Sequence, residues 1–90
     1  MMGTDSLGQR VKGIARMEFY YDVLCLALRN NPDLLKEDPP IKAMLDQLTD
    51  YYQNGQWLQD YTLDEQGMLP PELKRGVLSQ DGVFNLLDRI

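Results

Sequence analysis

Apolar side chains recur at steps of three and four residues through the first third of the chain, which is the spacing of one face of an α-helix. The positions of this first stripe are Leu7, Val11, Ile14, Met17, Tyr21, Leu24 and Leu28. Residues 1–6 precede the pattern and are expected to be frayed. Asn30-Asn31-Pro32 follows it, and proline disfavours helical geometry in the residue before it. The sequence therefore predicts one long helix that ends near Asn30.

The same segment carries a second apolar stripe, which lies nearly opposite the first at about 100° per residue. It consists of Phe19, Val23 and Leu26, with Tyr20 and Ala27 beside them. A helix that is apolar on two sides must be covered on two sides. Either the short helix at Trp57 and the C-terminal helix cover this stripe within one chain, or a partner does. We favour a partner, and predict a homodimer or protein-binding surface formed by Phe19, Tyr20, Val23 and Leu26 and centred on Val23.

The middle of the chain contains clear helix starts and stops. Leu34 and Leu35 allow one short helical turn. Asp38 before Pro39-Pro40 is typical of a helix start, and Asn54-Gly55 is typical of a stop. The second long helix is expected between these signals, with an apolar face of Ile41, Met44, Leu45, Leu48 and Tyr52. A short helix over Gln56–Asp64 should follow, ended by Gly67. The segment "MLPPEL" should then cross the surface in extended form, with room for a single turn after Pro71.

The segment "GVLSQD" (residues 76–81) is typical of a joint that precedes a final helix. Ser79 is a preferred N-cap residue, and Asp81 suits the dipole of a first turn. Val77 and Leu78 should anchor the entry of the chain into the core. Gly76 indicates either a positive φ or a close approach of chains. In the final helix, Val83, Leu86, Leu87 and Ile90 are expected to share one face.

These elements predict an all-α fold. We expect one helical domain over residues 1–90: a small bundle of two longer helices plus two short helices, closed by an ordered proline-bearing crossover.

Charge is distributed unevenly along this acidic chain, whose formal net charge is −5. No lysine or arginine occurs from Ala43 to Leu73, while six carboxylates do. Such a surface repels phosphate backbones, so we expect no nucleic-acid binding. The longest apolar runs are far too short to span a membrane, and the first fifteen residues lack the apolar segment of a secretory signal. We therefore expect a cytoplasmic protein that does not bind a membrane.

The residue types needed for common catalytic sites are mostly missing. The chain has no histidine, which removes Ser-His and Cys-His pairs and the commonest metal ligand. Cys25 lies within the long helical pattern and is expected to be a small core residue. Asp60-x-Thr62-x-Asp64 begins like a calcium loop, but Glu65 stands where that loop needs glycine. No glycine-rich phosphate loop occurs. We expect no metal and no cofactor, and predict that the protein is not an enzyme.

Residues 51–87 contain a distinctive series of motifs: a Tyr-Tyr pair, Trp-x-x-Asp, Gly-x-Leu-Pro, and Gly-Val-Leu-Ser-x-Asp before a terminal Leu-Leu. The matching positions are Tyr51, Tyr52, Trp57, Asp60, Gly67, Leu69, Pro70, Gly76, Val77, Leu78, Ser79, Asp81, Leu86 and Leu87. This pattern resembles a family of short bacterial proteins classed only as a domain of unknown function. The linker "NNPDLLKEDPP" departs from the continuous helical stretch of that family. The resemblance implies a small helical bacterial protein, and it brings no activity, cofactor or catalytic residue.

One aromatic and charged cluster remains as a candidate site. Its members are Tyr51, Tyr52, Trp57, Asp60, Tyr61, Arg75 and Asp81. As a functional site, they would line a groove for a peptide or a small polar ligand, because Trp, Tyr and Arg dominate binding hot spots. As a structural cluster, Trp57 and Tyr52 would fill the core, and Asp60 or Asp81 would pair with Arg75 to lock the crossover. We favour the structural role.

Two functions follow from this pattern. The first is a non-catalytic interaction or regulatory module that works through a helical surface. The alternative is a small-ligand sensor or minor enzyme that uses Trp57, Asp60, Arg75 and Asp81.

Overall fold

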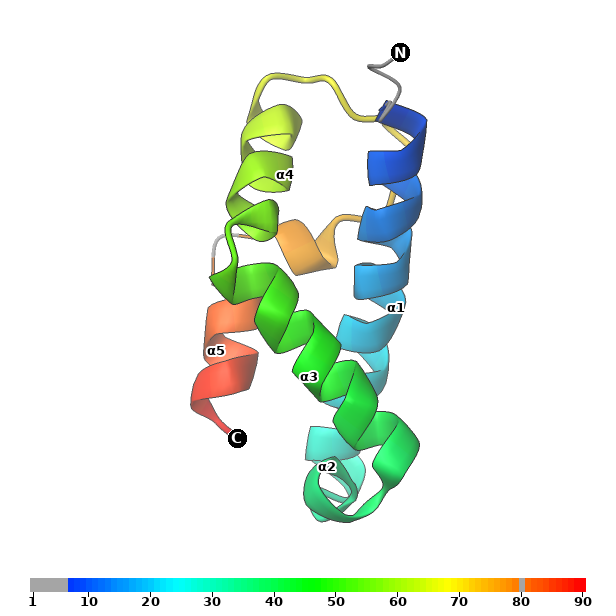
Figure 1. The fold of residues 1–90 in the computed structure, drawn as a ribbon, viewed down its shortest axis with the longest axis vertical. Coiled ribbons are helices and arrows are strands. Elements are labelled where there is room, and N and C mark those ends of the chain that lie inside the picture. The colour runs from blue at the N-terminus through cyan, green and yellow to red at the C-terminus, as the bar shows by residue number, and fades with distance from the viewer. Residues whose placement is uncertain (1–6, 80) are drawn as a thin grey trace.

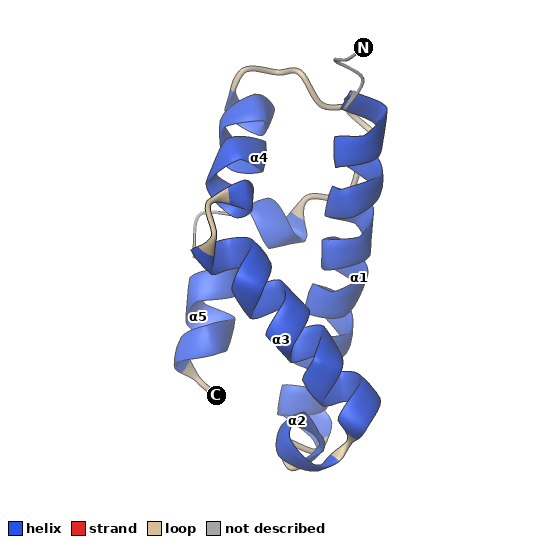
Figure 2. Cartoon of the chain, viewed as in Figure 1, coloured by secondary structure: helices blue, strands red, loops and turns tan. Residues whose placement is uncertain are grey.

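The computed structural model of the chain describes residues 7–79 and 81–90, so the expected fraying of residues 1–6 lies outside it. Over the described residues the chain forms α-helices and one 3-10 turn, and no strand (Figure 2). The elements are α1 (Leu7–Asn30), α2 (Leu34–Glu37), α3 (Pro39–Gln53), α4 (Gln56–Glu65), the 3-10 turn η1 (Gly76–Leu78) and α5 (Gly82–Asp88). The predicted all-α class is confirmed.

The long helix α1 runs the length of the molecule, and α3 returns diagonally across it after the short turn α2 (Figure 1). From the end of α3 the chain continues into α4, which runs back toward the start of α1. The crossover, residues 66–75, then passes over that end of the molecule to reach η1. The last helix, α5, begins beyond η1 and contacts it. Nowhere in the part of the chain that the structure describes is a helix both long and apolar enough to cross a membrane.

Local signals set the predicted boundaries of α3 and α4. Proline occupies the first positions of α3, as expected from Asp38-Pro39, although the Asp38 side chain makes no capping hydrogen bond. Between the two helices Gly55 has a φ of 96°, which favours glycine, and the Asn54 side-chain oxygen accepts a hydrogen bond from Gln56 N at 3.0 Å. Gly67, with a φ of 72°, follows α4 in the same way.

The core is continuous, and α4 contributes to it only through the partly buried Trp57 and Leu63, which pack against its buried members. Its buried members are Ile14, Leu24, Ala27, Leu35, Leu48, Tyr51, Leu69, Val77, Leu78, Val83 and Leu86. Most of the first stripe of α1 packs against these side chains, as predicted. Leu7 is the exception, because it begins the helix at the end of the molecule and stays 40% exposed. At the other end of the chain, Ile90 lies beyond α5 and is 42% exposed.

The joint before α5 exists, but its predicted cap is wrong. Ser79 does not cap α5: it follows η1 with an extended backbone, and α5 begins at Gly82 after Asp81. The reason is that the 3-10 turn occupies Gly76–Leu78, so Ser79 ends that turn instead of starting the helix. Of the two alternatives for Gly76, the close approach is correct, because a Cβ there would lie 3.1 Å from Glu18 Oε2. The φ of Gly76 is not positive.

Candidate functional site

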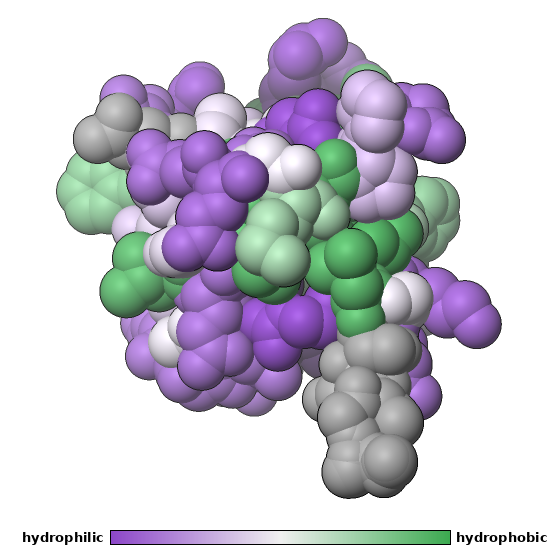
Figure 3. All heavy atoms as spheres, turned by 90° about the horizontal axis from the view of Figure 1, so that it is seen from above, coloured by the Kyte–Doolittle hydropathy of each residue, from purple (hydrophilic) through white to green (hydrophobic). Residues whose placement is uncertain are grey.

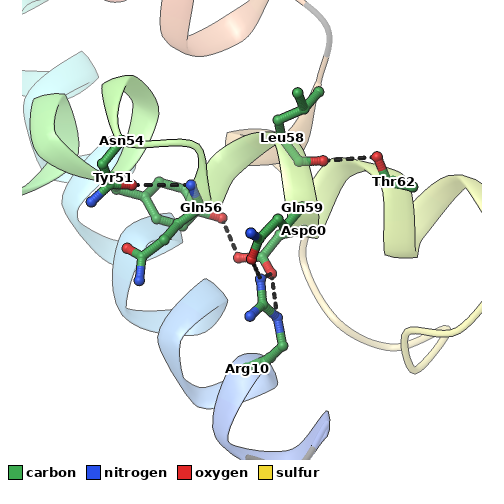
Figure 4. A network of polar contacts seen from close by, with 8 residues as sticks. All are labelled: Arg10, Tyr51, Asn54, Gln56, Leu58, Gln59, Asp60 and Thr62. Atoms are coloured by element: carbon green, nitrogen blue, oxygen red, sulfur yellow. Dashed lines mark hydrogen bonds and ion pairs between the residues drawn. The ribbon is translucent and has the colours of Figure 1, made fainter.

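Asp60 is the centre of a buried polar network that joins α1, α3 and α4 (Figure 4). Its side chain lies on α4 and the residue is only 4% exposed. Arg10 donates two hydrogen bonds to Asp60 Oδ1, from Nε at 2.8 Å and from Nη2 at 2.6 Å. The Tyr51 hydroxyl donates to Asp60 Oδ2 at 2.7 Å. Burial, together with the hydrogen bond to Asp60, raises the pKa of Tyr51 above its usual value, so the phenol stays protonated near neutral pH.

The predicted pairing of Asp60 or Asp81 with Arg75 is wrong. Arg75 lies beside Asp64, with 2.9 Å between Arg75 Nε and Asp64 Oδ1. This contact is an ion pair without a well-aligned hydrogen bond, because Nε lacks an acceptor in suitable geometry. The Arg75 Nη2 group also donates to the carbonyl of Pro70 at 2.8 Å. The physical reason is position on α4: Asp60 is bonded to Arg10 of α1, whereas Asp64, one turn later, lies closer to the crossover.

A row of three aromatic rings forms a second, separate part of the predicted cluster. Trp57 packs edge-on against Tyr52, with ring centroids 5.2 Å apart, and stacks on Tyr61 at 5.0 Å. The Trp57 indole donates to the carbonyl of Val77 at 2.8 Å. The row therefore attaches η1 to α4. Tyr61 lies near the carboxylate of Glu65, whose charge raises the Tyr61 pKa, with a smaller contribution from Asp81.

Glu18 is the residue that sequence reasoning missed. It is 6% exposed, and its Oε1 accepts a hydrogen bond from the backbone N–H of Val77 at 2.7 Å. The two backbone groups of Val77 are therefore both bonded to side chains, one on α1 and one on α4. A sequence signal did exist, because Glu18 follows Ile14 by four residues and so lies on the buried side of the first stripe.

The predicted cluster thus divides into three parts with internal partners. Asp60 and Tyr51 bond with Arg10, the aromatic row bonds with Val77, and Arg75 holds the crossover. Asp81 is exposed. A hollow of about 280 Å³ borders Arg10 and Asp60, which is below the usual volume of a small-molecule site. In residues 7–79 and 81–90 no cluster of carboxylate and thiol side chains suits a metal ion.

The second stripe of α1 is only partly covered. Phe19 is 57% exposed and Leu26 is 56% exposed, while Val23 and Tyr20 between them are half-buried. The alternative in which the short helix at Trp57 and the C-terminal helix bury this stripe is therefore wrong for Phe19 and Leu26. The rings of Phe19 and Tyr20 lie near one another, with centroids 6.1 Å apart.

Residues 14–90 match the family model described as Domain of unknown function (DUF4298), and the chain belongs to this family. The match agrees with the resemblance that the C-terminal motifs suggested. A comparison with curated proteins found no match, and a comparison with solved structures found none either.

Proposed function

We propose that this member of a family of unknown function is a non-catalytic protein-interaction module of a bacterial cytosol, which binds its partner through the exposed face of α1. The observation that carries the proposal is the placement of Phe19 and Leu26. These two large apolar side chains lie two turns apart on one helix, with Val23 between them, and both are more than half exposed. Exposed apolar patches on small proteins commonly mark interaction surfaces.

The polar cluster supports this choice over a ligand sensor. A binding site needs hydrogen-bonding groups that are free to turn toward a ligand. Here the Asp60 carboxylate accepts from Arg10 and Tyr51, and the Trp57 indole donates to a backbone carbonyl. Arg75 is in contact with Asp64 and Pro70. The Arg75–Pro70 bond holds the crossover itself, and each of the other contacts joins two elements of the fold, so these side chains have a sufficient structural role.

The first partner to test is a second copy of the chain, because two-fold pairing of identical helices is the commonest way to cover such a face. The test compares sedimentation equilibrium of the wild type with a Phe19→Glu/Leu26→Glu variant. Both positions are exposed, so the variant should keep its helicity in circular dichroism. Leu58→Glu is the matched control, because Leu58 is 59% exposed on α4, a different face. A dimer that is lost in the variant and kept in the control is the expected result.

If the wild type is monomeric, the partner must be a protein other than a second copy of the chain. The tagged wild type, variant and control are then compared by affinity capture from the native host. The proposal expects at least one protein captured by the wild type and by Leu58→Glu but not by Phe19→Glu/Leu26→Glu. Capture of the same proteins by all three chains, together with a monomeric wild type, would contradict it.

A further inference from the structure

A hollow of about 420 Å³ lies between the C-terminal half of α1 and α5, on a different side of α1 from Phe19 and Leu26. Figure 1 shows these two helices on either side of α3. The α1 side supplies Tyr21, Cys25 and Arg29, and the α5 side supplies Asn85 and Arg89. The volume is within the usual range of small-molecule sites. None of the described carboxylate side chains lines the hollow, although the whole chain carries 14 of them.

The two arginines at this hollow differ from others in the molecule. Arg10 and Arg75 each contact an aspartate, and Lys74 contacts Asp22. Among the residues that the structure describes, neither Arg29 nor Arg89 forms an ion pair or a side-chain hydrogen bond with the protein. Burial raises the pKa of the Cys25 thiol between them, and so does the charge of Asp22, whereas Arg29 and Arg89 each lower it by less. Both guanidinium groups therefore lie close to Cys25 at this hollow.

The polar groups beside these cations suit an anion. The Tyr21 hydroxyl and the Asn85 amide are hydrogen-bond donors, and arginine binds phosphate and carboxylate groups through paired N–H donors. The hydroxyl of Tyr21 lies close to the start of α5. A Cβ on Gly82 would be only 2.8 Å from it. Glycine at position 82 thus lets the phenol reach the wall of the hollow. Burial raises the pKa of Tyr21, which keeps it a donor at neutral pH.

We propose that this hollow binds the oxyanion group of a small phosphate- or carboxylate-bearing metabolite, held by Arg29, Arg89 and the Tyr21 hydroxyl. The site is separate from the proposed interaction surface and does not depend on it. A simpler role for both arginines is to offset the dipoles of the helices whose C-terminal ends they occupy. That role would change stability alone, so the test needs a measure of ligand occupancy.

Cys25 provides this measure, because it is the only cysteine of the chain and lines the hollow. The rate of its alkylation by N-ethylmaleimide is measured in sodium phosphate, in sodium acetate and in sodium chloride at equal ionic strength. We expect phosphate, acetate or both to slow alkylation of the wild type in a saturable way, compared with chloride. Protection by only one of them identifies which oxyanion the hollow selects.

An Arg29→Gln/Arg89→Gln variant should need at least about ten-fold more anion for the same protection, because two charge-assisted contacts are removed. Lys12→Gln is the control, since it removes one exposed cation of α1 outside the hollow. Each protein is compared with itself in chloride, which cancels the effect of the arginines on the thiol. If the double variant unfolds, Tyr21→Phe takes its place and should weaken protection without loss of charge. Protection of the wild type by neither anion, or equal protection in the double variant, would overturn the proposal.

Discussion

The packing of α1 with α2 and α3 and the packing of the crossover with η1 both bury apolar side chains, but they differ in how the backbone is satisfied. Between the regular helices the contacts are made by residues such as Leu24, Leu35 and Leu48. Around η1, Val77 and Leu78 are also buried, but here the backbone of Val77 is bonded to side chains from distant parts of the chain. Glu18 bonds to the N–H of Val77 and Trp57 to its carbonyl.

The difference has a simple physical origin. A helix satisfies its own backbone groups, so two helices need only apolar faces to pack together. A single 3-10 turn leaves most of its backbone groups without partners, and a buried group without a partner costs about 1–3 kcal/mol. The turn η1 therefore requires side chains that provide those bonds. Within the candidate cluster, Trp57 and Arg75 bond to irregular backbone, at Val77 and at Pro70, whereas the Asp60 network joins regular helices.

The largest expected effect is a cavity in the helical region. Leu48→Ala removes a fully buried side chain between helices and should lower the free energy of unfolding by about 2–5 kcal/mol. Urea denaturation followed by circular dichroism measures it. Leu58→Ala is the matched control, because Leu58 is 59% exposed, and its effect should be within about 0.5 kcal/mol. Equal effects at the two positions would contradict the burial of Leu48 in the core and the exposure of Leu58.

Loss of the central carboxylate should have a smaller effect. Asp60→Ala leaves the buried Tyr51 hydroxyl without its acceptor and Arg10 without its anion, and should cost about 1–3 kcal/mol. Arg10 is partly exposed and regains water, which limits the loss. Asp46→Ala is the control, since Asp46 forms only an exposed ion pair with Lys42. The same denaturation measurement separates a structural Asp60 from one kept for ligand binding, whose removal would leave stability unchanged.

The sequence predicted what local signals determine. The end of α1 follows from Asn30-Asn31-Pro32, and the two ends of α3 follow from Asp38-Pro39 and Asn54-Gly55. Proline, glycine and cap residues act within a few positions, so a local stretch of sequence is enough to predict these boundaries. It did not predict which charges meet: Asp60 bonds with Arg10, 50 positions away, and no spacing rule encodes that pairing. Glu18 was missed because a glutamate in an amphipathic helix normally faces water. Its burial depends on a backbone N–H of η1, 59 positions later.

Tyr51→Phe should have a smaller effect that depends on pH. At pH 7 it removes one hydrogen bond to Asp60, worth about 1 kcal/mol. Tyr51 has an ordinary pKa of 10.0 when unfolded and a raised one when folded, so its contribution is present below pH 10 and is lost as pH rises above it. Above pH 10 the wild type should therefore lose stability faster than the variant, by up to about 1.4 kcal/mol per pH unit.

Urea titrations between pH 8 and pH 11 test this difference. Tyr21, Cys25 and Tyr61 also have raised pKa values and contribute to both proteins, so only the difference between the two curves reports on Tyr51. Parallel curves would indicate that the phenol is not buried against Asp60.

The smallest expected effect concerns the joint before α5. Ser79→Ala should change the free energy of unfolding by no more than about 0.5 kcal/mol, because Ser79 is exposed and its side chain does not cap the helix. A true N-cap would cost about 1 kcal/mol. Thermal or urea denaturation distinguishes the two values, and the larger one would place the start of α5 at Ser79.

Hydrogen exchange at the amide of Val77 tests most directly whether polar side chains hold the η1 turn. The amide lies in a single 3-10 turn, and its hydrogen bond goes to Glu18. We predict that it exchanges nearly as slowly as the core amides of α3, and that Glu18→Ala accelerates it far more than those amides. Exchange in the wild type as rapid as that of an exposed loop amide, or a rate unchanged by Glu18→Ala, would contradict the account.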